Sequence, residues 1–351
     1  MENHFIESTR GGIRSMRKPD GQTLLLGSVI VGAIGLLGYL LASDHKATSG
    51  SRSQPSARLT LAKIPFDGQR AYRWLSDLCA LGRRPSGSPG MRKQQQLLAD
   101  HFTRLGGEVD FQRFRHWVDG EAVPMANLVV QWQPDRKQRI LLCAHYDTRP
   151  YPDRDPNRRR RRGTFVGAND GASGVAVLCE MARHMRELDS RYGVDFVLFD
   201  GEEYILKEKR DTYFAGSEHF ARQYVADPPP YRYRYGVLLD MVGDANLQIY
   251  QEKNSLRRRD SRRLVQDIWT VAADLEVREF IRRGRYTISD DHVPLMDIAD
   301  IPACDIIDFD YTKPGTRRSY WHTEADTPDK CSALSLAKVG WVVHEWLRRL
   351  E

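Results

Sequence analysis

Four short apolar segments alternate with helical patterns along most of the chain, and this alternation constrains the fold more than any other feature. The segments are residues 140–144, 194–199, 236–241 and 303–307. Each is typical of a strand that is buried on both faces. Helical patterns are found at 65–82, 90–105, 171–187, 214–225, 255–274 and 333–350. We therefore expect one α/β domain of three layers, in which a central, mostly parallel mixed sheet is flanked by helices.

The N-terminal region has a different character. Residues 23–42 carry no charge and number about 20, enough for a helix that crosses a bilayer. Three arginines and a lysine precede this run, so the positive-inside rule predicts a cytoplasmic N-terminus and an extracytoplasmic (periplasmic or lumenal) main domain. A cleaved signal peptide is the alternative, but its apolar part spans only about 7–15 residues. The predicted order is a cytoplasmic segment (1–22), a transmembrane signal-anchor (23–42), a flexible linker (43–62) and a globular domain (63–351).

Charge and cysteine content exclude some functional classes. The net charge is +6, and arginine occupies every position of 158–162, with a second basic cluster at 257–263. No recognisable nucleic-acid module accompanies these runs, so we interpret them as solvated surface and expect no nucleic-acid partner. If the run at 158–162, in the predicted surface loop 153–163, borders a site entrance, it would favour acidic substrates. The five cysteines include no CxxC pair and do not form a disulfide framework.

Histidines and carboxylates follow the predicted strands directly. Open α/β sheets bind ligands at the carboxyl ends of their strands. His145 follows the first strand, Glu202 and Glu203 follow the second, and Asp240 ends the third. Asp170 precedes a predicted helix, and His322 lies in the loop before the last one. Separate chain segments are thus expected to deliver these side chains to one edge of the sheet.

A zinc site is the simplest physical account of this gathering. Zinc binds histidine nitrogen and carboxylate oxygen, and clustered carboxylates repel one another unless a cation compensates them. Taken singly, each residue has an ordinary explanation: Asp170 fits a helix N-cap, and Glu202-Glu203 fits an exposed charged pair. Their joint placement favours the metal. One of the two adjacent glutamates would bind metal, and the other would act as general acid and base with a raised pKa.

Six motifs then make the chain recognisable: HYDTRP, GANDGASGV, LFDGEE, LLDMVG, SDDHVP and YWHT. Their order resembles that of the zinc aminopeptidase-like superfamily and, more narrowly, of the bacterial type of glutaminyl-peptide cyclotransferase. The resemblance covers about residues 70–350. It implies that 63–351 is a zinc-dependent catalytic domain.

The resemblance implies two alternative metal sets. The two-zinc aminopeptidases use the positions of His145, Asp170, Glu203, Asp240 and His322. The cyclases hold one zinc through the positions of Asp170, Glu203 and His322, and His145 is a ligand only if a second zinc is bound.

The remaining roles follow the cyclases. Glu202 matches their proton shuttle, Asp240 and Asp290 match its hydrogen-bond partners, and Trp321 matches a wall of the substrate pocket. Trp321 directly before His322, and an extra aspartate in Asp290-Asp291, favour the cyclase. Residues 204–208 lack a tryptophan that the animal cyclases have, and Val175 replaces one of their disulfide cysteines.

The expected activity is conversion of N-terminal glutaminyl residues of peptides or proteins to pyroglutamate with release of ammonia, using one Zn²⁺ per chain. The alternative is a zinc aminopeptidase with one or two zincs. A membrane-tethered binding domain is a third possibility, but such a domain has no need of Glu202. The expected partners are the Gln-initiated substrate and, through 23–42, the membrane.

Overall fold

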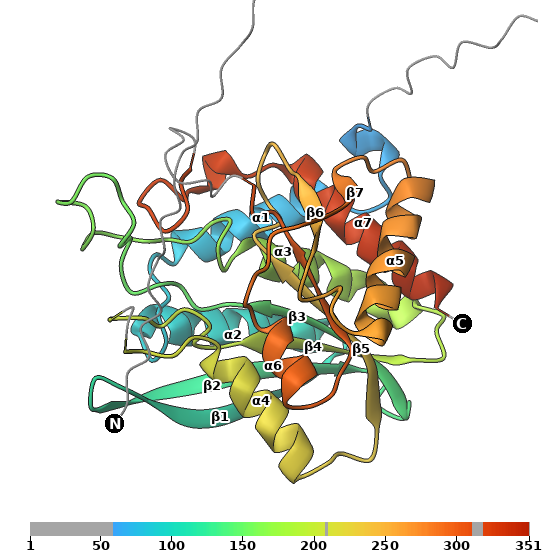
Figure 1. Ribbon diagram of the computed structural model, residues 1–351, viewed down its shortest axis with the longest axis horizontal. Helices are drawn as coiled ribbons and strands as arrows, with labels where there is room; N and C mark the ends of the chain where they lie inside the picture. Colours follow the sequence, from blue (N-terminus) through green and yellow to red (C-terminus); the bar gives the residue numbers. More distant parts are fainter. Residues whose placement is uncertain (1–58, 208–209, 311–318, 351) are drawn as a thin grey trace, which may run out of the picture. The chain divides into compact units, whose positions relative to one another are not determined.

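The computed structural model describes residues 59–207, 210–310 and 319–350, all of which belong to a compact unit spanning Ala57–Glu351. Its main sheet has six strands in the order β1-β2-β4-β3-β5-β8 (Figure 1). The strands are β1 (Glu108–Val118), β2 (Glu121–Trp132), β3 (Gln138–His145), β4 (Gly193–Phe199), β5 (Arg232–Asp240) and β8 (Ala303–Ile307). β4, β3, β5 and β8 pair in parallel, whereas β1 and β2 add two antiparallel pairings at one side. The predicted mixed sheet is confirmed.

Three of the four predicted strands lie within observed strands of the parallel region, and the fourth, 236–241, extends one residue beyond the end of β5. Every residue of β4 and of β8 is buried, as expected for strands covered on both faces. Alternate residues of β3 contribute to different hydrophobic clusters: Ile140 and Leu142 to one, and Leu141 and Cys143 to the other. The sheet therefore has a separate core on each face.

Helices cover both faces of the sheet (Figure 1). The helices of the larger cluster are α1 (Gly68–Ala80), α2 (Pro89–Arg104), α3 (Ser173–Met181), α5 (Arg259–Asp274) and α7 (Ala333–Arg349). The smaller cluster includes Phe220 of α4 (Ala215–Ala226) and Leu295 and Met296 of α6 (His292–Asp297). This arrangement confirms the expected helix–sheet–helix layers.

Several elements differ from the sequence analysis. β1 and β2 were not predicted, and neither were α6 or the two-stranded parallel sheet of β6 (Ile249–Glu252) and β7 (Phe280–Arg285). The helical pattern at 171–187 is α3 followed by a 3₁₀ helix, Ala182–Glu187. The pattern at 255–274 becomes helical only at Arg259. The predicted loop at 153–163 contains turns and bends without a helix or strand.

Among the described residues, no helix combines the length and the apolar character that a membrane span requires. The predicted segments 1–22 and 23–42, and most of 43–62, lie outside the described residues.

Candidate functional site

Neighbouring elements of the parallel region deliver the predicted site residues to one edge of the sheet. β3 ends at His145 and the adjacent β5 ends at Asp240. Glu202 and Glu203 follow β4 after a turn, and Asp170 lies just before α3. His322 belongs to the loop between β8 and α7. These side chains therefore lie at one edge of the sheet, as their positions relative to the predicted strands and helices indicated.

Asp170, Glu203 and His322 form the first half of the site. His322 Nε2 lies 3.2 Å from Glu203 Oε2 and 3.3 Å from Asp170 Oδ2. Zinc bonds to nitrogen and oxygen of about 2.0–2.2 Å in a tetrahedron place neighbouring ligand atoms about 3.3–3.6 Å apart. Asp170 Oδ2 is buried and accepts no hydrogen bond within the described residues. The spacing and the ligand types therefore fit a zinc ion.

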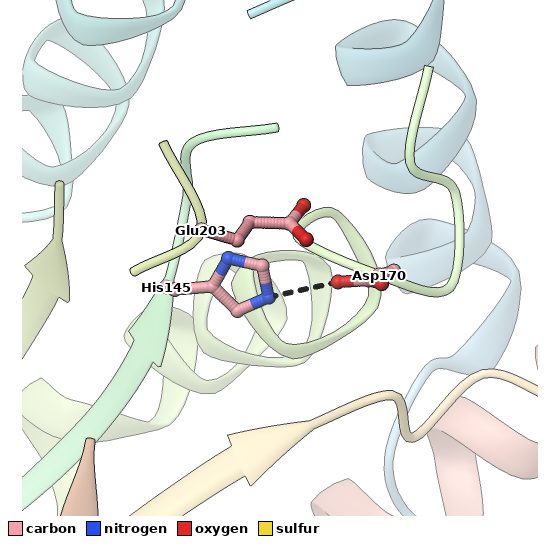
Figure 2. Close-up of side chains that lie close together, drawn as sticks. All are labelled: His145, Asp170 and Glu203. Atoms are coloured by element: carbon pink, nitrogen blue, oxygen red, sulfur yellow. Dashed lines mark ion pairs between the residues drawn. The ribbon is translucent and has the colours of Figure 1, made fainter. Parts of the chain in front are cut away.

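His145 and Asp240 form a second half that shares Asp170. His145 Nε2 lies 3.2 Å from Asp170 Oδ1 and 3.1 Å from Asp240 Oδ1. Figure 2 shows His145, Asp170 and Glu203 converging, and these residues offer ligand atoms within 4.8 Å of one another. Asp170 thus contacts a histidine through each of its oxygens, an arrangement that also suits two metal ions sharing one aspartate.

Three further residues fix the backbone around the site, and the sequence analysis did not assign them a role. Asp147 accepts hydrogen bonds from the N–H groups of Glu202 (3.0 Å) and Glu203 (3.2 Å). The Arg149 N–H donates to Glu203 Oε1 at 2.7 Å. Asp326 accepts from the N–H of Asp170 at 3.1 Å. Asp147 and Arg149 belong to the motif HYDTRP, whereas nothing in the sequence around Asp326 distinguishes it from an ordinary loop aspartate.

The pKa values of the acids in the site are shifted in different directions by burial and by neighbouring charges. Burial raises the pKa of Glu202 well above its usual range; the charge of His145 opposes this shift, and Asp290 adds to it. The pKa of Asp290 is also raised well above its usual range by burial and by Asp240. Burial alone would raise the pKa of Asp170, but its ion pairs with His145 and His322 hold it below its usual value. Glu202 is therefore suited to carry a proton, and Asp170 to remain an anion.

The neighbouring carboxylates raise the pKa values of the two histidines in the site. Burial lowers the pKa of His322, but Asp170 and Glu203 outweigh it, so that the net pKa is raised. Burial likewise lowers the pKa of His145, and Asp147, Asp170 and Asp240 raise it well above its usual value. A metal ion at either position would compete with the imidazole proton, because histidine binds metal in its neutral form.

A cavity of about 360 Å³ opens onto the site. All of the predicted site residues except His145 line it, namely Asp170, Glu202, Glu203, Asp240, Asp290, Trp321 and His322. The Trp321 ring centroid lies 4.1 Å from that of His322 and 5.4 Å from that of Phe309, another lining residue. The cavity therefore combines charged groups with an aromatic wall, as small-ligand sites commonly do.

Some of the residues that line this cavity have a strained backbone. Three of its lining residues have left-handed φ angles: His322 (54°), Met241 (48°) and Phe214 (66°). Residues other than glycine in such conformations each cost about 1–3 kcal/mol, and they cluster at functional sites.

Comparisons with known proteins agree with the fold. The chain belongs to peptidase family M28, whose model matches residues 127–347. The chain is 40% identical to the glutaminyl cyclase of Fimbriiglobus ruber, with a TM-score of 0.77 over 84% of this chain and 100% of that chain. It is also 31% identical to a Zn-dependent exopeptidase from Parabacteroides distasonis, with a TM-score of 0.75 over 81% of this chain and 99% of that chain.

A curated relative extends the similarity to animals. The chain is 24% identical to the glutaminyl-peptide cyclotransferase of Bothrops jararaca, over 76% of this chain and 78% of the relative. These findings confirm the resemblance that the six motifs predicted. Cyclases and zinc exopeptidases both appear among the similar structures, so the fold alone does not choose between the two reactions.

Proposed function

We propose that this chain is a zinc-dependent glutaminyl-peptide cyclotransferase, which converts N-terminal glutaminyl residues of peptides and proteins to pyroglutamate with release of ammonia. The observation that carries the proposal is the placement of Glu202, an acid with a raised pKa, beside Asp170, Glu203 and His322 in a cavity walled by Trp321. The 40% identity to a bacterial glutaminyl cyclase over that protein's full length supports it.

Asp170, Glu203 and His322 would hold one zinc ion per chain. When bound, the ion supplies Lewis-acid polarisation of the substrate's γ-carbonyl. Trp321 and Phe309 provide the apolar wall against which the glutamine side chain packs. Because attack is intramolecular, holding the glutamine in a bent conformation supplies much of the rate enhancement.

Glu202 carries the proton in this scheme. The α-amine nitrogen forms a bond to the side-chain amide carbon (Cδ) of the same residue, and Glu202 accepts the proton that this nitrogen loses. The bond between Cδ and the amide nitrogen then breaks, and Glu202 returns the proton to that nitrogen, which leaves as ammonia. Asp290 adds to the raised pKa of Glu202, since a nearby carboxyl group disfavours its ionised form, and Asp240 in turn raises the pKa of Asp290.

A zinc aminopeptidase is the second candidate, and one observation favours it. Asp170 lies between His145 and His322, and Asp240 contacts His145, which provides ligand types for a second zinc. Glu202 would then act as the base for an attacking water, and the product would be a free amino acid. The similarity to a Zn-dependent exopeptidase is consistent with this alternative.

Ammonia release from a Gln-initiated peptide tests the proposal. The zinc-loaded protein should release ammonia from this peptide but not from the same peptide with an acetylated α-amine, because the blocked nitrogen cannot attack. Equal release from both peptides would contradict cyclisation. Release of free glutamine instead of ammonia would favour the aminopeptidase.

We also propose that residues 23–42 anchor the chain in a membrane as a single span. The cytoplasmic side would hold 1–22, and 43–62 would tether an extracytoplasmic catalytic domain. The support is the uncharged run itself and the four basic residues before it. Extraction of the full chain by alkaline carbonate, which removes peripheral proteins, would contradict an inserted span.

A further inference from the structure

The wall of the active-site cavity carries a positive charge that the proposed reaction does not use. Among the described residues that line the cavity, Arg154 is the one with a lysine or arginine side chain. Its guanidinium carbon lies 3.9 Å from the centroid of the Trp321 ring, and its backbone N–H donates to the carbonyl of His322 at 3.2 Å. Arg154 is therefore held next to the chain segment that supplies a proposed metal ligand, and Trp321 contacts both His322 and the guanidinium.

Arg154 differs from the other charged residues of the cavity in its exposure. The carboxylates of Asp170, Glu203, Asp240 and Asp290 are buried, whereas Arg154 is solvent-exposed. The rest of a substrate whose N-terminal glutamine occupies the buried end would extend towards the exposed lining residues, which are Arg154, Thr287 and Ser289. Two residues of extended chain span about 7 Å, and the centroid of the Trp321 ring lies 4.1 Å from that of His322 and 3.9 Å from the guanidinium carbon of Arg154. The second residue of the substrate would thus come within reach of Arg154.

The arginine-rich loop continues this positive charge away from the cavity. All five residues of 158–162 are exposed. Glu324, two residues after His322, connects the loop to the site: its N–H donates to Asp155 Oδ2 (3.2 Å), and its side chain accepts from the N–H of Thr164 (3.3 Å) and lies 3.6 Å from Arg160 Nε. The loop, which connects β3 with α3 (Figure 1), therefore remains close to the segment that contains Trp321 and His322.

We propose that Arg154 is a specificity-determining residue that favours substrates with aspartate or glutamate directly after the N-terminal glutamine. The inference rests on the proposed cyclase function and deepens it. The guanidinium would bind the carboxylate of the second residue, and the exposed arginines of 158–162 would attract further acidic residues downstream. Because this wall is open to solvent, salt screens the preference, with a Debye length of about 10 Å at 0.1 M.

Matched peptides test the proposal with the full chain loaded with zinc. Gln-Glu, Gln-Ala and Gln-Lys peptides of otherwise identical sequence are compared by kcat/KM at low ionic strength. The wild type should prefer Gln-Glu over Gln-Lys, and Arg154→Ala should lower kcat/KM for Gln-Glu about fivefold, mainly through KM. Gln-Ala should be unaffected, and Arg154→Glu should reverse the order of the charged peptides. Arg104→Ala, which removes an exposed arginine at the end of α2, should leave the preference unchanged.

Each other outcome overturns a defined part of the account. An equal loss for all three peptides in Arg154→Ala would mean that Arg154 only packs against Trp321, and the specificity proposal would be wrong. The same would follow if the wild type did not discriminate among the peptides while cyclising all of them. If no Gln-initiated peptide were cyclised at all, the proposed function itself would fail.

Discussion

At the scale of single residues, Glu202 is the group on which the proposed chemistry depends. Glu202→Gln keeps the shape of the side chain and removes its titratable proton. Since general acid–base catalysis contributes about 10²–10⁴-fold, kcat should fall by at least about 100-fold. Zinc content should not change, because Glu202 is not among the proposed ligands. Steady-state kinetics and zinc analysis measure both effects. Exposed Glu187→Gln is the control, and wild-type turnover in Glu202→Gln would contradict the assigned role.

The two histidines of the site provide a paired test of metal number. His322 contacts Asp170 and Glu203, whereas His145 contacts Asp170 and Asp240. With one zinc per chain, His322→Ala should lose the metal on dialysis, and His145→Ala should retain it. Elemental analysis of the wild type and of both variants measures the number of zinc ions per chain. Two zincs in the wild type, with one lost in each variant, would support the aminopeptidase alternative.

The sequence located site residues correctly where they lie at the end of a strand. His145 and Asp240 are terminal residues of β3 and β5, so the position of the strand in the sequence locates the side chain in space. Asp326 escaped prediction because its role depends on a contact with the N–H of Asp170 across 156 positions of sequence. No local pattern encodes such a contact.

At the scale of elements, α3 positions the metal site through a close helix–strand contact. A Cβ atom on Gly174 would lie 2.1 Å from the carbonyl oxygen of Leu239 in β5 and 3.0 Å from Cβ of Ala144 in β3. Gly174→Ala should therefore push α3, with Asp170 at its start, away from the sheet. We expect a loss of about 1–3 kcal/mol in the free energy of unfolding, measured by denaturant titration.

A second glycine serves as the control for that substitution. A Cβ atom on Gly284, in β7, would lie 3.4 Å from a terminal carbon of Leu256, which is ordinary contact. Gly284→Ala should change stability little. Equal stability of Gly174→Ala and Gly284→Ala would show that the contact between α3 and the sheet is not as close as described.

Strands were predictable to the extent that their burial was uniform. β4 and β8 are buried at every residue, so their apolar runs were recognisable. β1 alternates between exposed and half-buried positions and carries charged residues such as Arg113 and Arg115, so its pattern did not stand out. α6, with six residues, is too short to show helical periodicity.

At the scale of the whole molecule, the metal site joins distant parts of the chain. Asp170, Glu203 and His322 come from three separate segments, and a ligand that binds only the folded state stabilises it in proportion to the logarithm of its concentration over Kd. A chelator should therefore lower the Tm, and added zinc should restore it. Scanning calorimetry measures the shift. Asp170→Ala, which lacks a shared ligand, should show no response to the chelator; a similar shift in this variant would contradict the proposed ligand set.

The central claim, that this site cyclises N-terminal glutamine, is tested most directly by the product of one peptide. The zinc-loaded protein is incubated with a Gln-initiated peptide, and the product mass is determined by mass spectrometry. The account predicts a peptide that retains all of its residues and has lost the mass of one ammonia. A peptide shortened by its first residue, or one that is unchanged, would contradict it.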